Sequence, residues 1–458
     1  HFSLFSEKNS DIGALFRRHV IGGVSVVFCR RAVAGETLIG GSPMTGIAGW
    51  DCNSLYPTVL AGRQPSGAPV IRRAARGFRP EHGGSRHTTM YVVLDWIAKK
   101  TGVHIRHKHN TGKENAVGPY RPDGLATRIG RDGKPIVSVY EYDGCIYHFH
   151  DPRVCPITRR LKNDDFIRKI RPRAKATRRR NEYYRSLGID VTVVRECEWN
   201  AVKDPELTEF VDSYKPDFYR SHKGAVTEDE ILDAVRSGEL FGFVQASVTV
   251  PRRMYDQFDE FPVIHCNSIL KPEHYSPHMR AYCARQKVPI KPRRLLLSGF
   301  KVKHLLMSTD LVRWYLGKGI RVHDLQLVVE YVPRNCFADY IGSLVDMRIA
   351  ADRDPNLSVI AHTSKALMSS SYGATLINRA KYRNVKFVVG TINARKAVNN
   401  PLFVRMNVIS HEDKIYEVVY AKGNVRETIP LQIAQTVLNN SKLLMARYVL
   451  NLLFKVVG

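Results

Sequence analysis

The stretch Gly49-Trp50-Asp51-Cys52-Asn53-Ser54-Leu55-Tyr56-Pro57 holds the residues from which the fold can be argued. Its pattern predicts a strand that ends at Asp51, followed by a turn that ends in proline. A carboxylate on a rigid strand end suits Mg²⁺, which prefers oxygen ligands at fixed positions. Tyr56 would then form a wall beside a bound sugar. An aspartate at such a place is also commonly a cap or turn residue, so this stretch alone leaves both interpretations open.

A second stretch, Lys365-Ala366-Leu367-Met368-Ser369-Ser370-Ser371-Tyr372-Gly373, combines one lysine with a Tyr-Gly pair. The lysine ammonium is a compact point charge that suits a phosphate group. Arg348 lies upstream and is a plausible second phosphate ligand. An ordinary surface helix that carries one lysine is the simpler interpretation of the same residues.

The first stretch resembles motif A of family B DNA polymerases, in the form used by their protein-primed branch. The resemblance implies that Asp51 binds both catalytic Mg²⁺ (or Mn²⁺) ions. It also implies that Leu55 and Tyr56 lie under the incoming triphosphate, and that Tyr56 excludes a ribose 2′-OH. Gly22 and Gly23 look like the Gly-Gly segment that precedes motif A in this family, where the backbone approaches template DNA closely.

The second stretch resembles motif B, which in this family lies on a fingers helix. The resemblance implies that Lys365 contacts the triphosphate and that Tyr372 packs at the nascent base pair. Ser369 stands where the family usually has Asn, and Arg348 would be a further nucleotide contact. The resemblance therefore implies DNA template–primer and dNTPs as partners.

The family's second metal-binding segment, motif C (Tyr-x-Asp-Thr-Asp), is not present in the sequence. Residues 430–445 look like the helix that precedes motif C, and the chain stops at Gly458, about where motif C would follow. The 3′–5′ exonuclease domain would precede His1. Because two-metal catalysis needs both acidic segments, we expect a fragment cut at both ends: the parent protein polymerises DNA and this chain alone does not.

The two stretches are separated by more residues than a palm and fingers need, which predicts an insert. Within it, three cysteines and a histidine at close spacing form a plausible tetrahedral zinc site. Scattered free cysteines are the alternative. Acidic residues and a histidine surround the same strands and could bind Mg²⁺ and activate water for phosphodiester cleavage. The residues of this nuclease-like group are Asp123, Glu141, Asp143 and His148.

Residues 140–199 of this insert resemble the very-short-patch-repair endonuclease, which has a restriction-endonuclease-like fold. That resemblance implies that Asp123 is a metal ligand and His148 the catalytic histidine. Asp143 stands where the endonuclease has a histidine, and Cys155 lies three residues later than expected. These departures favour an insert that binds DNA without cutting it. The implied ligands of a structural Zn²⁺ are Cys145, His150, Cys155 and Cys197.

Charge points to a polyanionic partner, since the 458 residues contain 70 Lys+Arg and 43 Asp+Glu, with a net charge of +27. A ribosome-associated or merely basic protein remains an alternative. Residues 159–180 contain eleven Lys/Arg and two Asp. A solvated helix face would explain this run, but its place beside Tyr183 and Tyr184 favours contact with DNA phosphates. The implied DNA-binding residues there are Arg178, Arg179 and Arg180.

Composition excludes several other classes. Hydrophobic residues make up 44% and charged residues 25%, which are globular values. No apolar run reaches the roughly 18–20 residues of a membrane span, and no signal peptide is evident, so we expect no membrane partner and an intracellular protein. Eight cysteines are too few for a secreted disulfide scaffold of this length.

The predicted fold class is α/β: an α+β palm around an antiparallel sheet, helical fingers, and an inserted restriction-endonuclease-like α/β domain. The resemblance extends to residues 240–262, which look like polymerases of self-synthesising transposons and related viruses. Such enzymes are primed by a terminal protein, although no residue here demonstrates protein priming. The predicted domains are palm with motif A (1–68), endonuclease-like insert (87–200), palm continuation (201–340), fingers with motif B (341–395) and truncated palm return (396–458), and residues 69–86 are interpreted as a basic linker.

The sequence also predicts several local elements. Residues 1–68 are expected to be strand-like, and residues 190–199 are expected to form a strand. Thr227-Glu228-Asp229-Glu230 is a capping box that predicts the start of a helix. The spacing of Ile433, Val437, Leu444 and Tyr448 predicts a long helix near the C-terminus.

The function predicted from these observations is template-directed DNA synthesis in DNA replication, with two other classes open. One is a metal-dependent DNA endonuclease that uses the polymerase part as a clamp. The other is a catalytically decayed DNA-binding protein derived from a mobile element. Nucleotide binding would separate the last class from the first.

Overall fold

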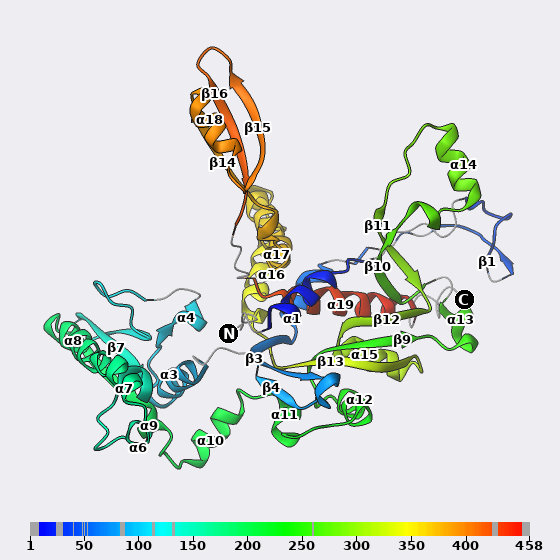
Figure 1. The fold of residues 1–458 in the computed structure, drawn as a ribbon. Helices are drawn as coiled ribbons and strands as arrows, with labels where there is room; N and C mark the ends of the chain where they lie inside the picture. The colour runs from blue at the N-terminus through cyan, green and yellow to red at the C-terminus, as the bar shows by residue number, and fades with distance from the viewer. Residues whose placement is uncertain are drawn as a thin grey trace. The chain divides into compact units, whose positions relative to one another are not determined.

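The structure is a computed structural model of the chain (Figure 1). It describes residues 9–23, 31–39, 41–47, 49, 51–52, 54–82, 88–111, 115–130, 133–258, 261–423 and 429–450. Within these ranges the chain divides into two compact units. The first unit comprises residues 66–243 and 326–333, and the second comprises residues 9–65, 244–325 and 334–450.

The α/β class predicted from the sequence is confirmed, because the described residues form both helices and largely antiparallel sheets. The largest sheet has five strands in the order β12–β9–β13–β3–β4. Its strands are β3 (Gln64–Arg73), β4 (Pro80–His82), β9 (Gly242–Thr249), β12 (Lys301–Ser308) and β13 (Arg321–Arg334). At Gly242 a side chain would be impossible, since a Cβ atom there would lie 2.0 Å from the carbonyl oxygen of Val329.

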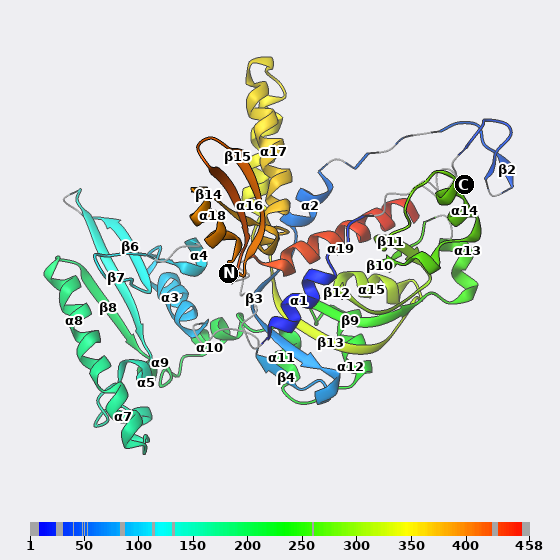
Figure 2. The same ribbon diagram turned by 45° about the horizontal axis from the view of Figure 1, so that its top comes forward.

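In the second unit, the helix α19 (Leu431–Tyr448) packs on β12 and on α15 (Thr309–Gly317). Figure 2 shows α19, in red, with α1 (Ser10–Arg18) against it. Apolar residues such as Ile433 and Val437 are fully buried, as the helical spacing of the sequence predicted. The buried Thr436 hydroxyl of α19 donates within the helix, to the carbonyl of Gln432 at 2.9 Å, whereas the Gln435 amide donates to the carbonyl of Leu306 on β12 at 3.2 Å.

Two long antiparallel helices, α16 (Ala338–Ala351) and α17 (Ser358–Ala374), pack along one another in the same unit. The short helix α2 (Leu55–Ala61) contacts α16, α17 and α19. This arrangement places the start of α2 between the residues of α17 and those of α19, which is the basis of the site described below.

Two smaller sheets complete the second unit. β14 (Arg383–Val389), β15 (Phe403–Ser410) and β16 (Ile415–Ala421) form an antiparallel sheet in the order β14–β16–β15. Helix α18 (Thr391–Val398) packs on all three strands. β10 (Ile264–Leu270) pairs with β11 (Arg293–Gly299), and α14 (Pro277–Arg285) lies in their connection.

The first unit is built around a four-stranded sheet in the order β5–β6–β7–β8, in which only the β7–β8 pair is parallel. The strands are β5 (Arg106–His107), β6 (Gly124–Ile129), β7 (Pro135–Asp143) and β8 (Asp190–Arg195). Helix α3 (Thr88–Thr101) covers one face and shares a small core with Leu94, Ala126 and Tyr140. Helix α8 (Pro172–Ser186) packs on β8 and reaches the other face of the sheet. Neighbouring residues of a strand point to opposite faces, so α3 and α8 meet different side chains of the same strands.

The remaining elements are short. They are β1 (Leu38–Ile39), β2 (Ser42–Pro43), α4 (Lys108–Thr111), α5 (Cys145–His148), α6 (Pro156–Arg159), α7 (Asp164–Ile170), α9 (Glu196–Trp199), α10 (Pro205–Asp212), α11 (Asp217–Ser221), α12 (Glu228–Ser237) and α13 (Tyr255–Phe258). The capping box predicted at the start of α12 is confirmed, with Thr227 and Glu230 bonded reciprocally.

The interpretation of residues 69–86 as a basic linker is wrong for residues 69–82, the part of this segment that the structure describes. Residues of β3 such as Val70 and Ile71 are buried in the five-stranded sheet. The guanidinium of Arg72 is also buried; it pairs with Glu330 and donates to the carbonyl of Phe78 at 3.0 Å. Burial raises the pKa of Glu330 to about 7, while the charge of Arg72 opposes that rise. The basic residue that suggested a linker is therefore part of a core, because a partner distant in sequence neutralises it.

Other local predictions differ in detail from the structure. Residues 1–68 were expected to be strand-like, yet the described part of this segment contains helices α1 and α2. The strand predicted from Asp190 to Trp199 ends at Arg195, and the rest forms α9. None of the helices in the described ranges is both long and apolar enough to cross a membrane.

Candidate functional site

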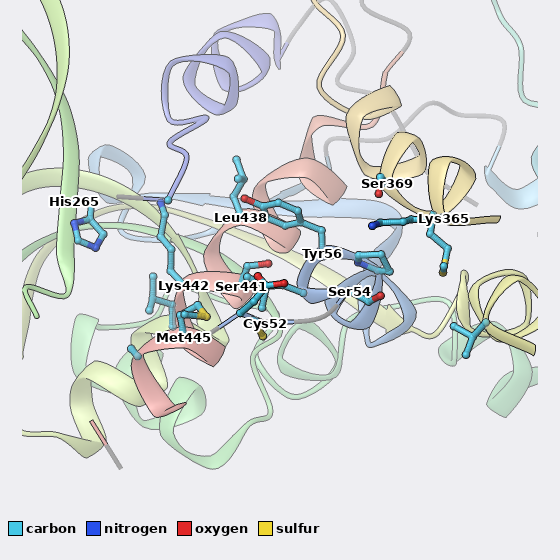
Figure 3. Close-up of a pocket in the computed structure, with 18 of the residues that line it drawn as sticks. Cys52, Ser54, Tyr56, His265, Lys365, Ser369, Leu438, Ser441, Lys442 and Met445 are labelled. Atoms are coloured by element: carbon cyan, nitrogen blue, oxygen red, sulfur yellow. The ribbon is translucent and has the colours of Figure 1, made fainter. Parts of the chain in front are cut away.

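A cavity of about 1110 Å³ lies within the second unit (Figure 3). Its walls come from the segment around α2, from α16 and α17, from α19, and from the residues before β10. Most of the residues that the sequence singled out for nucleotide contact line it. These residues are Asp51, Leu55, Tyr56, Arg348, Lys365 and Ser369. Gly23, which was predicted to approach template DNA, also lines the cavity.

The two predicted motifs meet in this cavity. The rings of Tyr56 and Tyr372 are stacked, with centroids 4.5 Å apart and planes 13° from parallel. Tyr372 lies near the end of α17, one to two turns after Lys365 and Ser369, so the whole second stretch is on one helix as predicted. Ser54 has a left-handed backbone (φ 55°, ψ 34°) where α2 begins. That turn positions Tyr56 on the first turn of α2, opposite α17.

Asp51 does not follow a strand directly, contrary to the sequence-based expectation. The strand that precedes it in the described ranges, β2, ends at Pro43, and α2 begins at Leu55. The Asp51 side chain is exposed and makes no hydrogen bond or ion pair with any residue described. Its oxygens are therefore available to a cation. Asn53 of the same motif lies outside the described residues.

The two predicted phosphate ligands differ in their surroundings. Lys365 is exposed and unpaired within the described ranges, as a free phosphate ligand should be. Arg348 forms an ion pair with Asp352, the residue that caps the end of α16, with 3.5 Å between Nε and Oδ2. Asp352 also lines the cavity. The carboxylate therefore competes with any phosphate for this guanidinium.

Sequence reasoning missed Lys442, which lines the cavity from α19. Figure 3 shows its side chain reaching toward His265. Burial lowers the pKa of Lys442 to about 7, and burial together with the charge of Lys442 lowers the pKa of His265 to about 4. Beside it, the Ser441 hydroxyl is buried without a hydrogen-bond partner among the residues described. A lysine within an otherwise apolar helical face was the signal that could have identified it.

Gly22 and Gly23 both have open space where a Cβ would lie, so sterics alone do not explain them. Gly23 contributes to the cavity wall and Gly22 does not. Residues 24–30, which follow them, lie outside the described residues.

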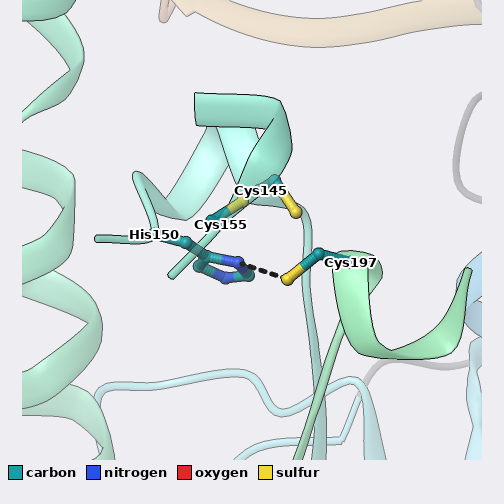
Figure 4. A group of neighbouring side chains, drawn as sticks. All are labelled: Cys145, His150, Cys155 and Cys197. Carbon is teal, nitrogen blue, oxygen red and sulfur yellow. Dashed lines mark hydrogen bonds between the residues drawn. The ribbon is translucent and has the colours of Figure 1, made fainter. Parts of the chain in front are cut away.

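A candidate metal centre lies in the first unit (Figure 4). One potential ligand atom from each of the four residues predicted from the sequence lies within 4.8 Å of every other. The residues could therefore hold a metal ion such as zinc. The cysteine thiolate and histidine nitrogen donors also suit that metal. The four residues are Cys145 on α5, His150 just after it, Cys155 just before α6, and Cys197 on α9.

The donor atoms of this centre contact one another and nearby backbone groups. The Cys197 sulfur lies 3.7 Å from Nδ1 of His150, and Nε2 of His150 is buried with no hydrogen-bond partner within the described ranges. Burial would raise the pKa of the Cys155 thiol, but hydrogen bonds from Thr158 and the Ile157 amide prevail and lower it to about 7. Burial raises the pKa of Cys145. The centre thus contains one thiol that readily deprotonates, as metal binding requires.

The nuclease-like residues also come together, on the face of the sheet that α8 reaches. The Asp123 carboxylate accepts a hydrogen bond from the Tyr142 amide at 2.9 Å. Nδ1 of His148 lies 3.4 Å from the Asp143 carboxylate. Arg180, predicted to contact DNA, instead pairs with Glu141 at 3.2 Å and with Asp143 at 3.1 Å.

Arg178 and Arg179 are exposed on α8, as a DNA-binding face requires. The neighbouring tyrosines behave differently from the expectation that they support DNA contact. Tyr184 is fully buried, and Tyr183 is partly covered and packs against Tyr120. On this helix the exposed cations, which include Lys175 as well as the two arginines, are in a position to meet a phosphate backbone, and the tyrosines are not.

Comparison with known proteins adds no relative. No family model matches the chain, and neither a curated protein nor a solved structure matches it.

Proposed function

We propose that the second unit binds a deoxynucleoside triphosphate on template–primer DNA and adds dNMP to the primer 3′-OH, in the manner of a family B DNA polymerase. The observation that carries this proposal is the meeting of the two motifs. Asp51, Tyr56 and Lys365 line one cavity, although Lys365 is more than 300 residues away from the other two in the sequence. Such convergence of a carboxylate, an aromatic wall and a phosphate-sized cation is what nucleotide transfer needs.

The residues would act as follows. Lys365 would hold the triphosphate as a point charge, and the stacked rings of Tyr56 and Tyr372 would border the sugar and the nascent base pair. Asp51 would be a carboxylate ligand of Mg²⁺, which when bound orients the primer hydroxyl and neutralises charge at the α-phosphate. Its lack of any protein partner within the described ranges fits that role.

A second function, DNA binding without catalysis, is favoured by one feature of the cavity. Among the described residues that line it, the carboxylates are Asp51 and Asp352, and Asp352 is paired with Arg348. A single unpaired carboxylate is less than two-metal chemistry requires. Nucleotide binding distinguishes the two functions, because a decayed DNA-binding protein has no need of it.

The test is to measure Mg²⁺-dependent dNTP binding to the chain on a template–primer, and primer extension in the same samples. We expect the complementary dNTP to bind more tightly than the three mismatched ones. Lys365→Ala should weaken that binding about tenfold or more, while the matched control Lys396→Ala, exposed on α18, should not. Absence of templated dNTP selectivity with intact DNA binding would establish the second function instead.

For the first unit we propose a structural zinc ion on Cys145, His150, Cys155 and Cys197, and DNA binding by the exposed arginines of α8. Four protein donors lie close to one another, which is enough to fill a tetrahedral zinc site without a position for substrate. This number of protein ligands supports a structural rather than a catalytic metal. Elemental analysis of purified chain should find about one zinc per molecule. A folded protein that contains none would refute the zinc site.

A further inference from the structure

The carboxylates of the first unit converge on one point because of the strand register. β6 and β7 are antiparallel, with Gly124 opposite Tyr140, so Asp123 comes opposite Glu141 at the next position. Glu141 and Asp143 are two residues apart on β7 and therefore share a face. This face is buried: the side chains of Glu141 and Asp143 are only 1% and 6% exposed. Three acidic groups in such a place need a cation or protons to balance them.

The balancing cation is already present in the chain. Arg180 of α8 places Nη1 3.2 Å from Oε2 of Glu141 and Nη2 3.1 Å from Oδ1 of Asp143. Its side chain is 16% exposed, so the guanidinium is largely withdrawn from solvent. A guanidinium is planar, permanently charged and shaped to bridge two carboxylates. It thus stands between the same oxygens that a divalent ion would ligate.

Burial also acts on the carboxylates themselves, because it disfavours their charged forms. Burial, aided by the charge of Asp123, raises the pKa of Glu141 to about 8, and burial also raises the pKa of Asp123. The other basic group facing the cluster is His148, whose Nδ1 lies 3.4 Å from the Asp143 carboxylate. Oε1 of Glu141 is buried and accepts no hydrogen bond from the residues described. One ligand position therefore remains unsatisfied even with Arg180 in place.

We propose that Arg180 is the resident cation of this cluster, so that Asp123, Glu141 and Asp143 bind a divalent metal ion only when the guanidinium is removed. The proposal is independent of the polymerase function of the second unit. Consecutive arginines of one helix then have different roles. Arg179 is exposed and available to DNA, whereas Arg180 pairs with the carboxylates and occupies the place of a metal ion. The first unit then holds DNA without Mg²⁺ and without cleaving it.

Mn²⁺ binding to the full, zinc-loaded chain tests this proposal, with free Mn²⁺ followed by electron paramagnetic resonance. All variants carry Asp51→Asn, so that the cavity of the second unit does not contribute. Arg180→Gln should gain a Mn²⁺ site that is tighter by about tenfold or more than any in the parent, since a like charge leaves the site. The matched control Arg179→Gln on the same helix should gain none. Adding Glu141→Gln to Arg180→Gln should abolish the new site.

A second measurement does not depend on how well Arg180→Gln folds. Glu141→Gln in the otherwise unchanged chain is close to the neutral form of this side chain and should fold normally. The proposal requires this variant and the parent to bind the same number of Mn²⁺ ions. A parent chain that binds one more Mn²⁺ than Glu141→Gln would overturn it, as would a folded Arg180→Gln that gains no site.

Discussion

The cavity of the second unit and the carboxylate cluster of the first unit contain similar groups but arrange their charges in opposite ways. In the cavity, Asp51 and Lys365 are exposed, and within the described ranges neither has a protein partner. In the cluster, Arg180 bridges Glu141 and Asp143, and all three side chains are largely buried. This difference shows that a charged residue available to a ligand is recognised by the absence of an ion-pair partner within the protein. Residue type alone does not separate the two situations.

The largest expected effect concerns the metal centre beside the closed cluster. Cys145→Ser, or removal of metal by a chelator, should lower the stability of the first unit by several kcal/mol, because the binding energy of a structural metal is folding energy. Hydrogen exchange should show the loss in β7, β8 and α8 and leave α17 and α19 unchanged. Cys283→Ser, on α14 and outside the centre, is the control. Equal protection with and without metal would contradict the prediction.

The next largest effect is expected for Lys442, which lines the cavity from α19. Lys442 has a folded pKa of about 7 against 10.5 for a free lysine, as a result of burial. The unfolded chain therefore binds more protons between these two values, and stability should rise with pH across that interval. Lys442→Met should raise the free energy of unfolding by about 2–4 kcal/mol at pH 6 and by little near pH 11. Urea denaturation at several pH values measures this; a gain that does not depend on pH would count against a buried charge.

A smaller effect is expected for the open carboxylate. Asp51→Asn should weaken Mg²⁺-dependent dNTP binding about 10- to 100-fold, since the amide is a much poorer ligand for the cation. Asp123→Asn removes a carboxylate from the closed cluster and should leave dNTP binding unchanged. Titration of dNTP with Mg²⁺ and with EDTA checks both variants. Equal losses in the two would remove the distinction between open and closed sites.

The Arg348–Asp352 pair provides an intermediate case inside the cavity. Asp352→Asn frees the guanidinium of Arg348, and dNTP should then bind a few-fold more tightly, because an exposed pair contributes about 1 kcal/mol or less. Arg348→Gln should have the opposite effect. Binding measured at low and high salt tests this, since the gain should shrink as salt screens the charges. Weaker binding in Asp352→Asn would instead indicate that Asp352 is itself a metal ligand.

The smallest effect concerns DNA binding by α8. Replacing Arg178 and Arg179 with Gln should reduce the slope of log K against log salt by about 2, because each phosphate contact releases about one counterion. Arg180→Gln should leave the slope unchanged, since that guanidinium faces carboxylates. Fluorescence anisotropy with duplex DNA at several salt concentrations measures the slopes. A change of slope in Arg180→Gln would show that Arg180 contacts DNA after all.

Much of the local structure could be predicted from the sequence, for reasons that are local. The helical spacing before Tyr448 and the Thr227–Glu230 capping box predicted α19 and α12, because side chains three and four residues apart decide such elements. The metal centre was also predicted, since three of its residues lie close together in the chain. Residues 69–86 were misinterpreted because basic composition does not reveal that Arg72 meets Glu330 in the sheet.

The sequence by itself determined the α/β class and the positions of the chemically important residue types. These are the two motifs that resemble polymerase motifs A and B, the Cys/His set and the basic helix. Only the tertiary structure decided which charges are paired. It placed Tyr56 on Tyr372, turned Arg180 toward the carboxylates, and left Lys442 half-buried without a partner among the residues described. The physical reason is that periodicity and spacing act over a few residues. The free energy of a charge depends instead on burial and on partners that the fold brings from distant parts of the chain.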